Sequence, residues 1–192
     1  MSISLVKGGT ISLTKEAPGL ARVQAGLGWD PRTTTGHDFD LDASVIACDA
    51  NGRCLSEQWF VFYGQLQSPN GAIVHQGDNL TGEGDGDDES ILVELSRLPE
   101  EAQRMVFAVS IHEADSRGQN FGQVANSYIR MVNAASGAEL ARFNLGEDYS
   151  TETAMVFGEL YRMGTEWKFR AVGHGYNGGL AAVIRDFGLN PA

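Results

Sequence analysis

An acidic, glycine-rich segment, Gly77–Glu89, is the part of the sequence best suited to chemistry. Its sequence is GDNLTGEGDGDDE, which contains six carboxylates, four glycines and no basic residue. Carboxylates this close together repel, by about 1 kcal/mol for two charges about 4 Å apart in water and about 4 kcal/mol at an effective dielectric of about 20. Glycine lets the backbone turn tightly and direct carbonyl oxygens inward, and calcium binds about six to eight oxygens from carboxylates, carbonyls and Asn side chains. The segment therefore predicts a calcium-binding loop, with a solvated acidic surface loop as the alternative.

A second acidic pattern lies at Asp38–Ala43, where carboxylates at positions 38, 40 and 42 alternate with apolar residues. In a strand, alternation places the three carboxylates on one face, while Phe39, Leu41 and Ala43 point to the core. Three like charges on one face are unfavourable unless a cation offsets them. The alternative is an edge strand whose charges deter aggregation. The pattern is not an EF-hand, because Ala43 occupies the position of the turn glycine, so a site built from both acidic segments requires the fold to bring them together.

The two cysteines, Cys48 and Cys54, are predicted to be buried strand thiols rather than metal ligands. They flank Asn51–Gly52, and a two-residue turn there would pair Cys48 with Leu55, leaving the two sulfurs unopposed. Their spacing also matches no zinc-binding pattern.

The sequence favours a binding protein over an enzyme. The histidines are scattered, at positions 37, 75, 112 and 174, and the sequence contains no nucleophile elbow, phosphate-binding loop or dinucleotide fingerprint. Two carboxylates suffice for acid–base catalysis, whereas six in one loop are better explained by metal ligation. A metal-dependent hydrolase that uses the same acidic cluster remains the enzymatic alternative.

The elements that must position these residues are predicted to be mostly strands, because short β-branched or aromatic runs alternate with Gly, Asn, Asp and Ser. A short C-terminal helix is expected at Leu180–Phe187, and no linker divides the chain. We therefore predict an all-β fold, a β-sandwich of two antiparallel sheets with long acidic loops, in a single domain over residues 1–192. The clearest strand candidates are Trp59–Tyr63, Ile91–Leu95, Met105–Ile111, Tyr128–Val132 and Trp167–Val172.

Composition limits the classes of binding partner and the cellular location that we expect for this protein. Asp and Glu number 25 against 14 Lys and Arg, for a net charge of −11, which argues against nucleic acid and anionic membranes as partners. The sequence contains neither a signal peptide nor an apolar run long enough for direct membrane insertion. Two cysteines do not make a disulfide framework, so a reducing, cytoplasmic location is expected.

Several motifs together resemble the TerD family of tellurium-resistance proteins over nearly the whole chain. The long acidic motif is the specific one, whereas the shorter motifs are weak individually. The matching segments are Gly26–Asp30 (GLGWD), Asp38–Ser44 (DFDLDAS), Gly77–Glu89, Phe121–Val124 (FGQV), Thr151–Arg162 (TETAMVFGELYR) and Trp167–Ala181 (WKFRAVGHGYNGGLA).

The resemblance implies a β-sandwich that holds two calcium ions between its loops and acts in the bacterial response to tellurite and related stresses. It also implies other Ter proteins and a membrane Ter component as partners, and an acidic scaffold within such a complex is the alternative function. Asp30 and Asp38 are left out of the implied ligand set, as is Glu113, which stands where the family usually has Asp. That set is Asp40, Asp42, Asp78, Asn79, Glu83, Asp85, Asp87, Asp88 and Glu89.

Overall fold

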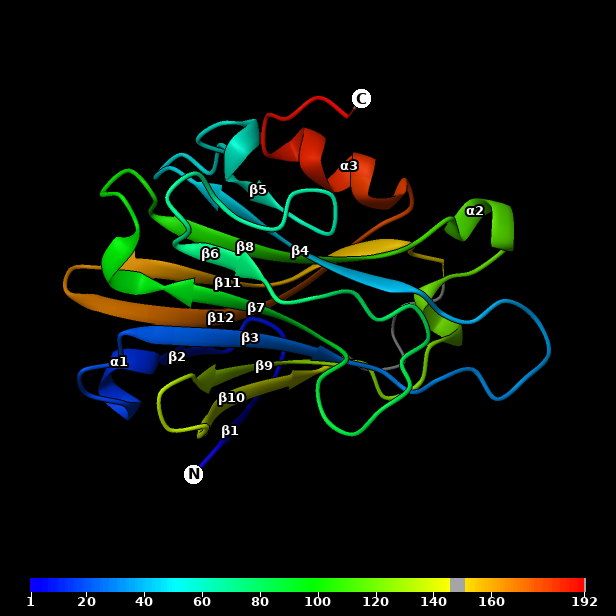
Figure 1. Cartoon of the computed structure of the whole chain (residues 1–192), viewed down its shortest axis with the longest axis horizontal. Helices are drawn as coiled ribbons and strands as arrows, with labels where there is room; N and C mark the ends of the chain where they lie inside the picture. The colour runs from blue at the N-terminus through cyan, green and yellow to red at the C-terminus, as the bar shows by residue number, and fades with distance from the viewer. Residues whose placement is uncertain (146–150, 192) are drawn as a thin grey trace.

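The computed structural model describes residues 1–145 and 151–191, which form two stacked β-sheets (Figure 1). Within these residues each sheet has six strands; sheet A has the spatial order β1-β10-β9-β3-β7-β6, and sheet B has β2-β12-β11-β8-β4-β5. Sheet A contains β1 (Ile3–Leu5), β3 (Arg22–Gly28), β6 (Ile73–His75), β7 (Glu89–Glu94), β9 (Tyr128–Asn133) and β10 (Glu139–Asn144). Sheet B contains β2 (Thr10–Ser12), β4 (Leu41–Cys48), β5 (Phe60–Val61), β8 (Arg104–Ile111), β11 (Ala154–Met163) and β12 (Glu166–Tyr176).

Helices are short and lie outside the core between the two sheets. Among the described strands, β1 pairs with β10 in parallel and the other pairings are antiparallel, so the predicted sandwich of two antiparallel sheets is confirmed in its main features. The helices are α1 (Leu13–Glu16), α2 (Ala114–Arg117) and α3 (Gly179–Asp186), with 3-10 turns η1 (Glu57–Trp59), η2 (Leu95–Arg97) and η3 (Phe121–Gln123). None of the helices in the described part of the chain is long and apolar enough to span a membrane.

The core lies between the sheets, and a second apolar layer lies outside sheet B. Strand β8 shows why: Phe107 and Val109 belong to the core, whereas Val106 and Ala108 face the layer beneath α3. A strand that is buried on both faces has a nearly continuous apolar sequence, and β8 has such a sequence. The predicted C-terminal helix is confirmed as α3, whose buried residues are Val183 and Ile184. The helix contacts β8 and β11 of sheet B and lies outside that sheet in Figure 1.

The predicted pairing of Cys48 with Leu55 is wrong, because the structure pairs Cys48 with Cys54. The turn is longer than two residues: Gly52 N donates to Asp49 O (3.1 Å), and Asp49 N donates to Arg53 O (2.8 Å). Gly52 has a φ of +79°, which fits a three-residue hairpin loop ending in a left-handed glycine. The longer loop shifts the register by one residue.

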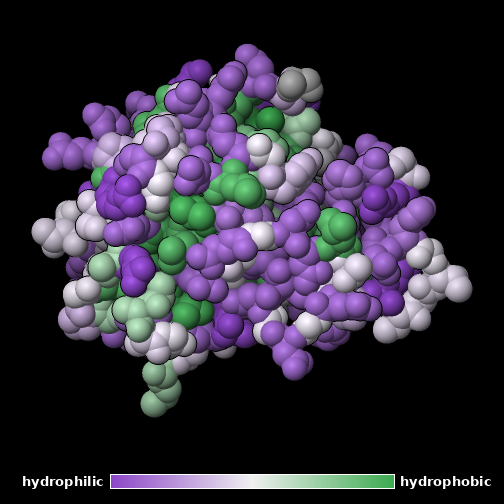
Figure 2. Space-filling view, viewed as in Figure 1, coloured by the Kyte–Doolittle hydropathy of each residue, from purple (hydrophilic) through white to green (hydrophobic). Residues whose placement is uncertain are grey.

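The loops that carry the acidic residues gather at one end of the sandwich (Figure 1). Residues 29–40 carry the chain from sheet A into β4 of sheet B, and residues 76–88 connect β6 to β7. Helix α2 and η3 lie at the same end (Figure 1). Figure 2 shows that hydrophilic residues cover most of this end on the face in view.

Candidate metal centre

Three aspartates from the two acidic segments meet in space. Asp40 and Asp42 come from the start of β4, and Asp78 comes from the loop between β6 and β7. One carboxylate oxygen of each lies within 4.8 Å of the other two. Asp40 and Asp42 are buried, with 7% and 5% exposure, whereas Asp78 is exposed. The centre therefore has two buried carboxyl groups and one exposed carboxyl group on the loop.

Burial makes negative charge at this centre unfavourable. Burial raises the pKa of Asp40, and the nearby Asp78 raises it further, whereas His112 lowers it. Burial, together with the charges of Asp40, Glu89 and Asp78, raises the pKa of Asp42 to about 8. Asp40 Oδ1 is buried and has no hydrogen-bond partner among the described residues. A buried carboxylate oxygen with no donor is costly unless a proton or a cation reaches it.

Among the described residues, two basic side chains lie near the centre, and neither forms a close, buried ion pair with its carboxylates. His112 Nδ1 lies 3.8 Å from Asp42 Oδ2, but the imidazole is partly exposed. Arg117 lowers the pKa values of Asp40 and Asp42, yet it forms an ion pair with Glu113 at 3.0 Å. Glu113, which was left out of the predicted set, thus engages Arg117.

Glu89 joins the two sheets beside the aspartates. Its Oε2 accepts a hydrogen bond from Ala43 N (2.7 Å), and its Oε1 accepts one from Asn79 N (3.2 Å). His75 Nε2 lies 3.5 Å from Glu89 Oε2, and both side chains are fully buried. Gly77 N donates to His75 Nδ1 (3.3 Å), so a neutral imidazole carries its proton on Nε2, toward Glu89. Glu89 therefore anchors the loop to β4 with both oxygens engaged.

His75 is a residue that the sequence analysis did not assign to the site. Its position two residues before the acidic segment was the available signal, but a scattered histidine is too common for that signal to decide.

Asn79 organises the acidic loop from within. Its Oδ1 accepts hydrogen bonds from the backbone of Thr81 and Gly82, both at 3.1 Å. Its Nδ2 donates to Asp88 Oδ1 (3.1 Å) and to Glu83 O (3.3 Å). The amide thus folds residues 79–88 on themselves, and Glu83 itself is exposed. The structure gives Asn79 contacts within the loop rather than a place among Asp40, Asp42 and Asp78.

Asp87 points to another part of the molecule. Its Oδ1 accepts hydrogen bonds from Arg130 Nε (2.7 Å) and Tyr128 Oη (3.0 Å), both on β9. A Cβ on Gly26 would lie 2.1 Å from Asp87 Oδ2, so glycine is required there for the carboxylate to sit against β3. Burial, with the neighbouring Asp87 charge, raises the pKa of Tyr128 to about 12. The structure therefore does not bring Asp87 to the three aspartates.

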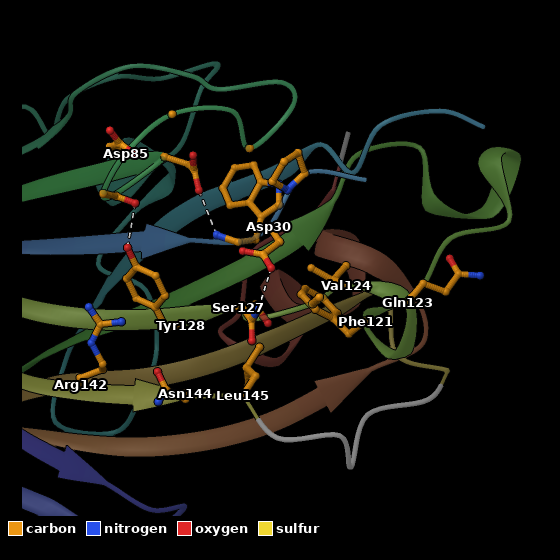
Figure 3. Close-up of a pocket in the computed structure, with 18 of the residues that line it drawn as sticks. Asp30, Asp85, Phe121, Gln123, Val124, Ser127, Tyr128, Arg142, Asn144 and Leu145 are labelled. Atoms are coloured by element: carbon orange, nitrogen blue, oxygen red, sulfur yellow. Dashed lines mark hydrogen bonds between the residues drawn. The ribbon is translucent and has the colours of Figure 1, made fainter. Parts of the chain in front are cut away.

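Three other acids line a cavity of about 990 Å³ on the far side of the loop (Figure 3). Asp88 Oδ2 accepts from Trp29 N (2.9 Å), and Asp30 Oδ2 accepts from Asn126 Nδ2 (2.6 Å). Asp85 is exposed on the loop, as Figure 3 shows. Burial raises the pKa of Asp88, and Asp30 contributes to the shift.

This cavity is rich in oxygen ligands. Gly82, Gly84 and Gly86 line it beside the carboxylates, and the carbonyl oxygen of Gly86 accepts a hydrogen bond from Tyr128 Oη (2.8 Å). Asp30 was left out of the predicted set although the GLGWD motif contains it, and Asp38 is exposed, with its carbonyl oxygen accepting from Gln119 Nε2 (3.1 Å).

Comparison with known proteins gives consistent matches along the chain. The TerD domain model matches residues 1–187. The chain is 54% identical over 190 residues to tellurium resistance protein TerD of Serratia marcescens, covering 99% of both chains. It is 53% identical to general stress protein 16U of Bacillus subtilis, covering 98% of both. A crystal structure of a telluride resistance protein (TerD) homologue from Streptomyces coelicolor has a TM-score of 0.71 at 26% identity, covering 90% of this chain and all of that one.

Proposed function

Because the chain belongs to the TerD domain family of tellurium resistance and general stress proteins, we propose that it acts by binding calcium at the Asp40–Asp42–Asp78 centre. The observation that carries the proposal is the buried, unpartnered Asp40 Oδ1 within a group of three converging carboxylates. A divalent cation would satisfy that oxygen and would offset both the burial and the repulsion between carboxylates, which together raise the pKa values of Asp40 and Asp42.

The donor set supports calcium among the divalent cations. Asp40, Asp42 and Asp78 supply hard carboxylate oxygens, which calcium prefers. Magnesium demands stricter octahedral geometry and keeps its water, so it should bind more weakly. When bound, calcium supplies positive charge that joins β4 to the loop.

A second calcium position is proposed in the cavity beyond the loop. Asp30, Asp85 and Asp88 would hold the ion there, with backbone carbonyls between Gly82 and Gly86. The raised pKa of Asp88, to which the charge of Asp30 contributes, supports this position, since a cation would reverse that repulsion. Both positions then share one loop, and each side of it would face one ion.

Three of the remaining members of the predicted set, Asn79, Asp87 and Glu89, take positioning roles in this proposal, whereas the exposed Glu83 takes none. Glu89 and Asn79 hold the loop against β4 and against itself, because their polar atoms are already engaged by the backbone. Asp87 secures the loop to β9 through Arg130. These contacts preorganise the acidic residues, so less ordering remains to be done when calcium binds.

Thermal melting and calorimetry with calcium, magnesium and EDTA test the proposal. At a free calcium concentration about 100-fold above the dissociation constant, each independent site should add about 2.7 kcal/mol to the free energy of unfolding. Asp42→Asn should lose the binding heat of the first site, whereas Glu101→Gln, which removes an exposed acid elsewhere, should bind like the wild type. Equal melting temperatures in calcium and EDTA, with no binding heat, would refute the proposal.

A further inference from the structure

Two free cysteines lie at the end of β4 that is remote from the metal centre. Cys48 is the last residue of β4, and Cys54 follows the hairpin turn; the two are directly opposite each other across the hairpin. Strand β4 begins at Leu41, beside the aspartates, and runs eight residues to Cys48. The thiol pair is therefore separate from the proposed calcium sites.

The backbone around the pair has the geometry that favours a disulfide. Hydrogen bonds on either side of the two cysteines make them a non-hydrogen-bonded pair, in which Cα atoms are about 4.5 Å apart and the side chains share a face. Disulfides span Cα separations of about 4.4–6.8 Å. We propose that this pair is a site of intramolecular disulfide formation under peroxide stress. The flanking bonds run from Asp49 N to Arg53 O (2.8 Å) and from Leu55 N to Ala47 O (3.0 Å).

The two sulfurs differ in their access to solvent, and this difference decides which cysteine reacts first. Cys48 is fully buried, in the apolar layer with Ile184 and Leu189 beneath α3. Cys54 is half-buried, and its Sγ donates to Ser56 O (3.1 Å). Peroxide can therefore reach Cys54 first, and Cys48 is the sulfur held in place to react second.

Hydrogen peroxide is the oxidant, and the reaction proceeds in two steps. The Cys54 sulfur attacks one peroxide oxygen, the O–O bond breaks, and sulfenic acid and one water form. The Cys48 sulfur then attacks the Cys54 sulfur; the S–S bond forms as the S–O bond breaks, and hydroxide leaves with the thiol proton as a second water. Two thiols thus lose two electrons and two protons, and one peroxide becomes two waters.

Burial also accounts for the stability of the reduced pair in the absence of oxidant. It raises the pKa of Cys48 to about 12 and raises the pKa of Cys54 as well, so both are thiols at neutral pH. A protonated thiol is a poor nucleophile, so the pair should react slowly at low peroxide and be consumed under sustained exposure.

The disulfide would close the hairpin beside the outer layer of the sandwich. Cys54 N donates to Phe187 O (2.9 Å), the residue that follows α3. Closing the ring between Cys48 and Cys54 restricts the unfolded chain, so the oxidised protein should melt at a higher temperature, by on the order of 5 °C.

Peptide mapping of the full-length protein after hydrogen peroxide treatment tests this directly. Trypsin cleaves after Arg53, which lies between the two cysteines, so a disulfide keeps the peptides 33–53 and 54–97 joined until they are reduced. We expect both thiols to be lost together, the joined peptides to appear, and dithiothreitol to restore the original melting temperature.

Two variants separate this reaction from simple overoxidation. In Cys54→Ser, the buried Cys48 should keep its free thiol at the same peroxide dose. In Cys48→Ala, Cys54 should stop as sulfenic acid that dimedone traps. If the wild-type Cys54 instead becomes sulfinic acid or joins a second molecule while Cys48 stays free, the proposal is wrong. Calcium binding should be the same before and after oxidation, because the two sites lie at opposite ends of β4.

Discussion

At the scale of single residues, aspartates in the acidic segments differ in what neutralises them. Asp87 has a protein partner, because Arg130 and Tyr128 both donate to its Oδ1. Asp42 is buried among other acids, with an imidazole nitrogen 3.8 Å away, and burial with these neighbouring charges raises its pKa to about 8. A carboxylate without an internal cation is the one that needs an external cation, which distinguishes ligand from anchor among residues that look alike in the sequence.

The raised pKa of Asp42 predicts a pH dependence in the absence of calcium. The unfolded chain releases this proton near pH 3.8 and the folded chain near pH 8, so stability is fully present below pH 3.8 and is lost as the pH rises to about 8. In EDTA, Asp42→Asn should therefore melt above the wild type at pH 8, and the difference should shrink toward pH 4.

Melting curves of both proteins across this pH range are the measurement, with Glu101→Gln as the charge-matched control. Adding calcium at pH 8 should reverse the order, since calcium stabilises the ionised wild type and not the variant. A wild type that melts above Asp42→Asn in EDTA at pH 8 would contradict the assigned environment of Asp42.

At the scale of elements, the acidic loop is held between Trp29 and the aspartates. Trp29 comes directly after β3, and its indole Nε1 donates to Phe39 O (3.0 Å), at the approach to β4. Gly82 rests on this indole with a φ of +74°, and a Cβ there would lie 2.3 Å from Trp29 Nε1. The indole of Trp29 therefore supports the loop and also links the end of β3 in sheet A to the residues that lead into β4 of sheet B.

Gly82→Ala should displace the acidic loop from the indole of Trp29. Both the left-handed backbone and the contact with Trp29 oppose a methyl group, so we expect a loss of about 1–3 kcal/mol in stability and weaker calcium binding. Gly84→Ala is the matched control, because Gly84 also has a positive φ, of +139°, but nothing lies within 4 Å of its Cβ position. Calorimetry and melting of the two variants measure the difference; equal effects would mean that backbone strain alone matters.

At the scale of the whole molecule, the proposed calcium centre and the proposed disulfide site lie at opposite ends of β4. The acidic loops occupy one end (Figure 1), while the cysteine hairpin and the C-terminal end of α3 meet away from them, at the far end of β4. A rigid core of apolar residues from both sheets separates these regions. The net charge of −11 also favours cations over anionic partners across the whole surface.

Hydrogen exchange followed by mass spectrometry should show this division. Calcium should slow exchange in peptides covering residues 29–40 and 77–88, and leave those covering the Cys48–Cys54 hairpin and α3 unchanged. Asp42→Asn serves as the control for the loop peptides. Equal slowing throughout the chain would mean that calcium acts on global stability rather than on the loop end.

Local patterns in the sequence were sufficient to predict the fold class, and composition alone identified the acidic, oxygen-rich loop. Alternation and turn residues predicted a β-sandwich, and the continuous apolar run of Met105–Ile111 became β8, buried on both faces. Six carboxylates among four glycines predicted an oxygen-rich segment, because composition and spacing are properties of the chain itself.

Which side chains face each other was decided only by the tertiary structure. Asp78 meets Asp40 and Asp42, whereas Asp87, nine residues later, turns to Arg130, because the loop folds around Asn79 and presents different residues on its two sides. The register of the cysteine hairpin likewise depended on one additional loop residue. Contacts between distant segments depend on how the chain crosses between sheets, and periodicity within one segment does not report that crossing.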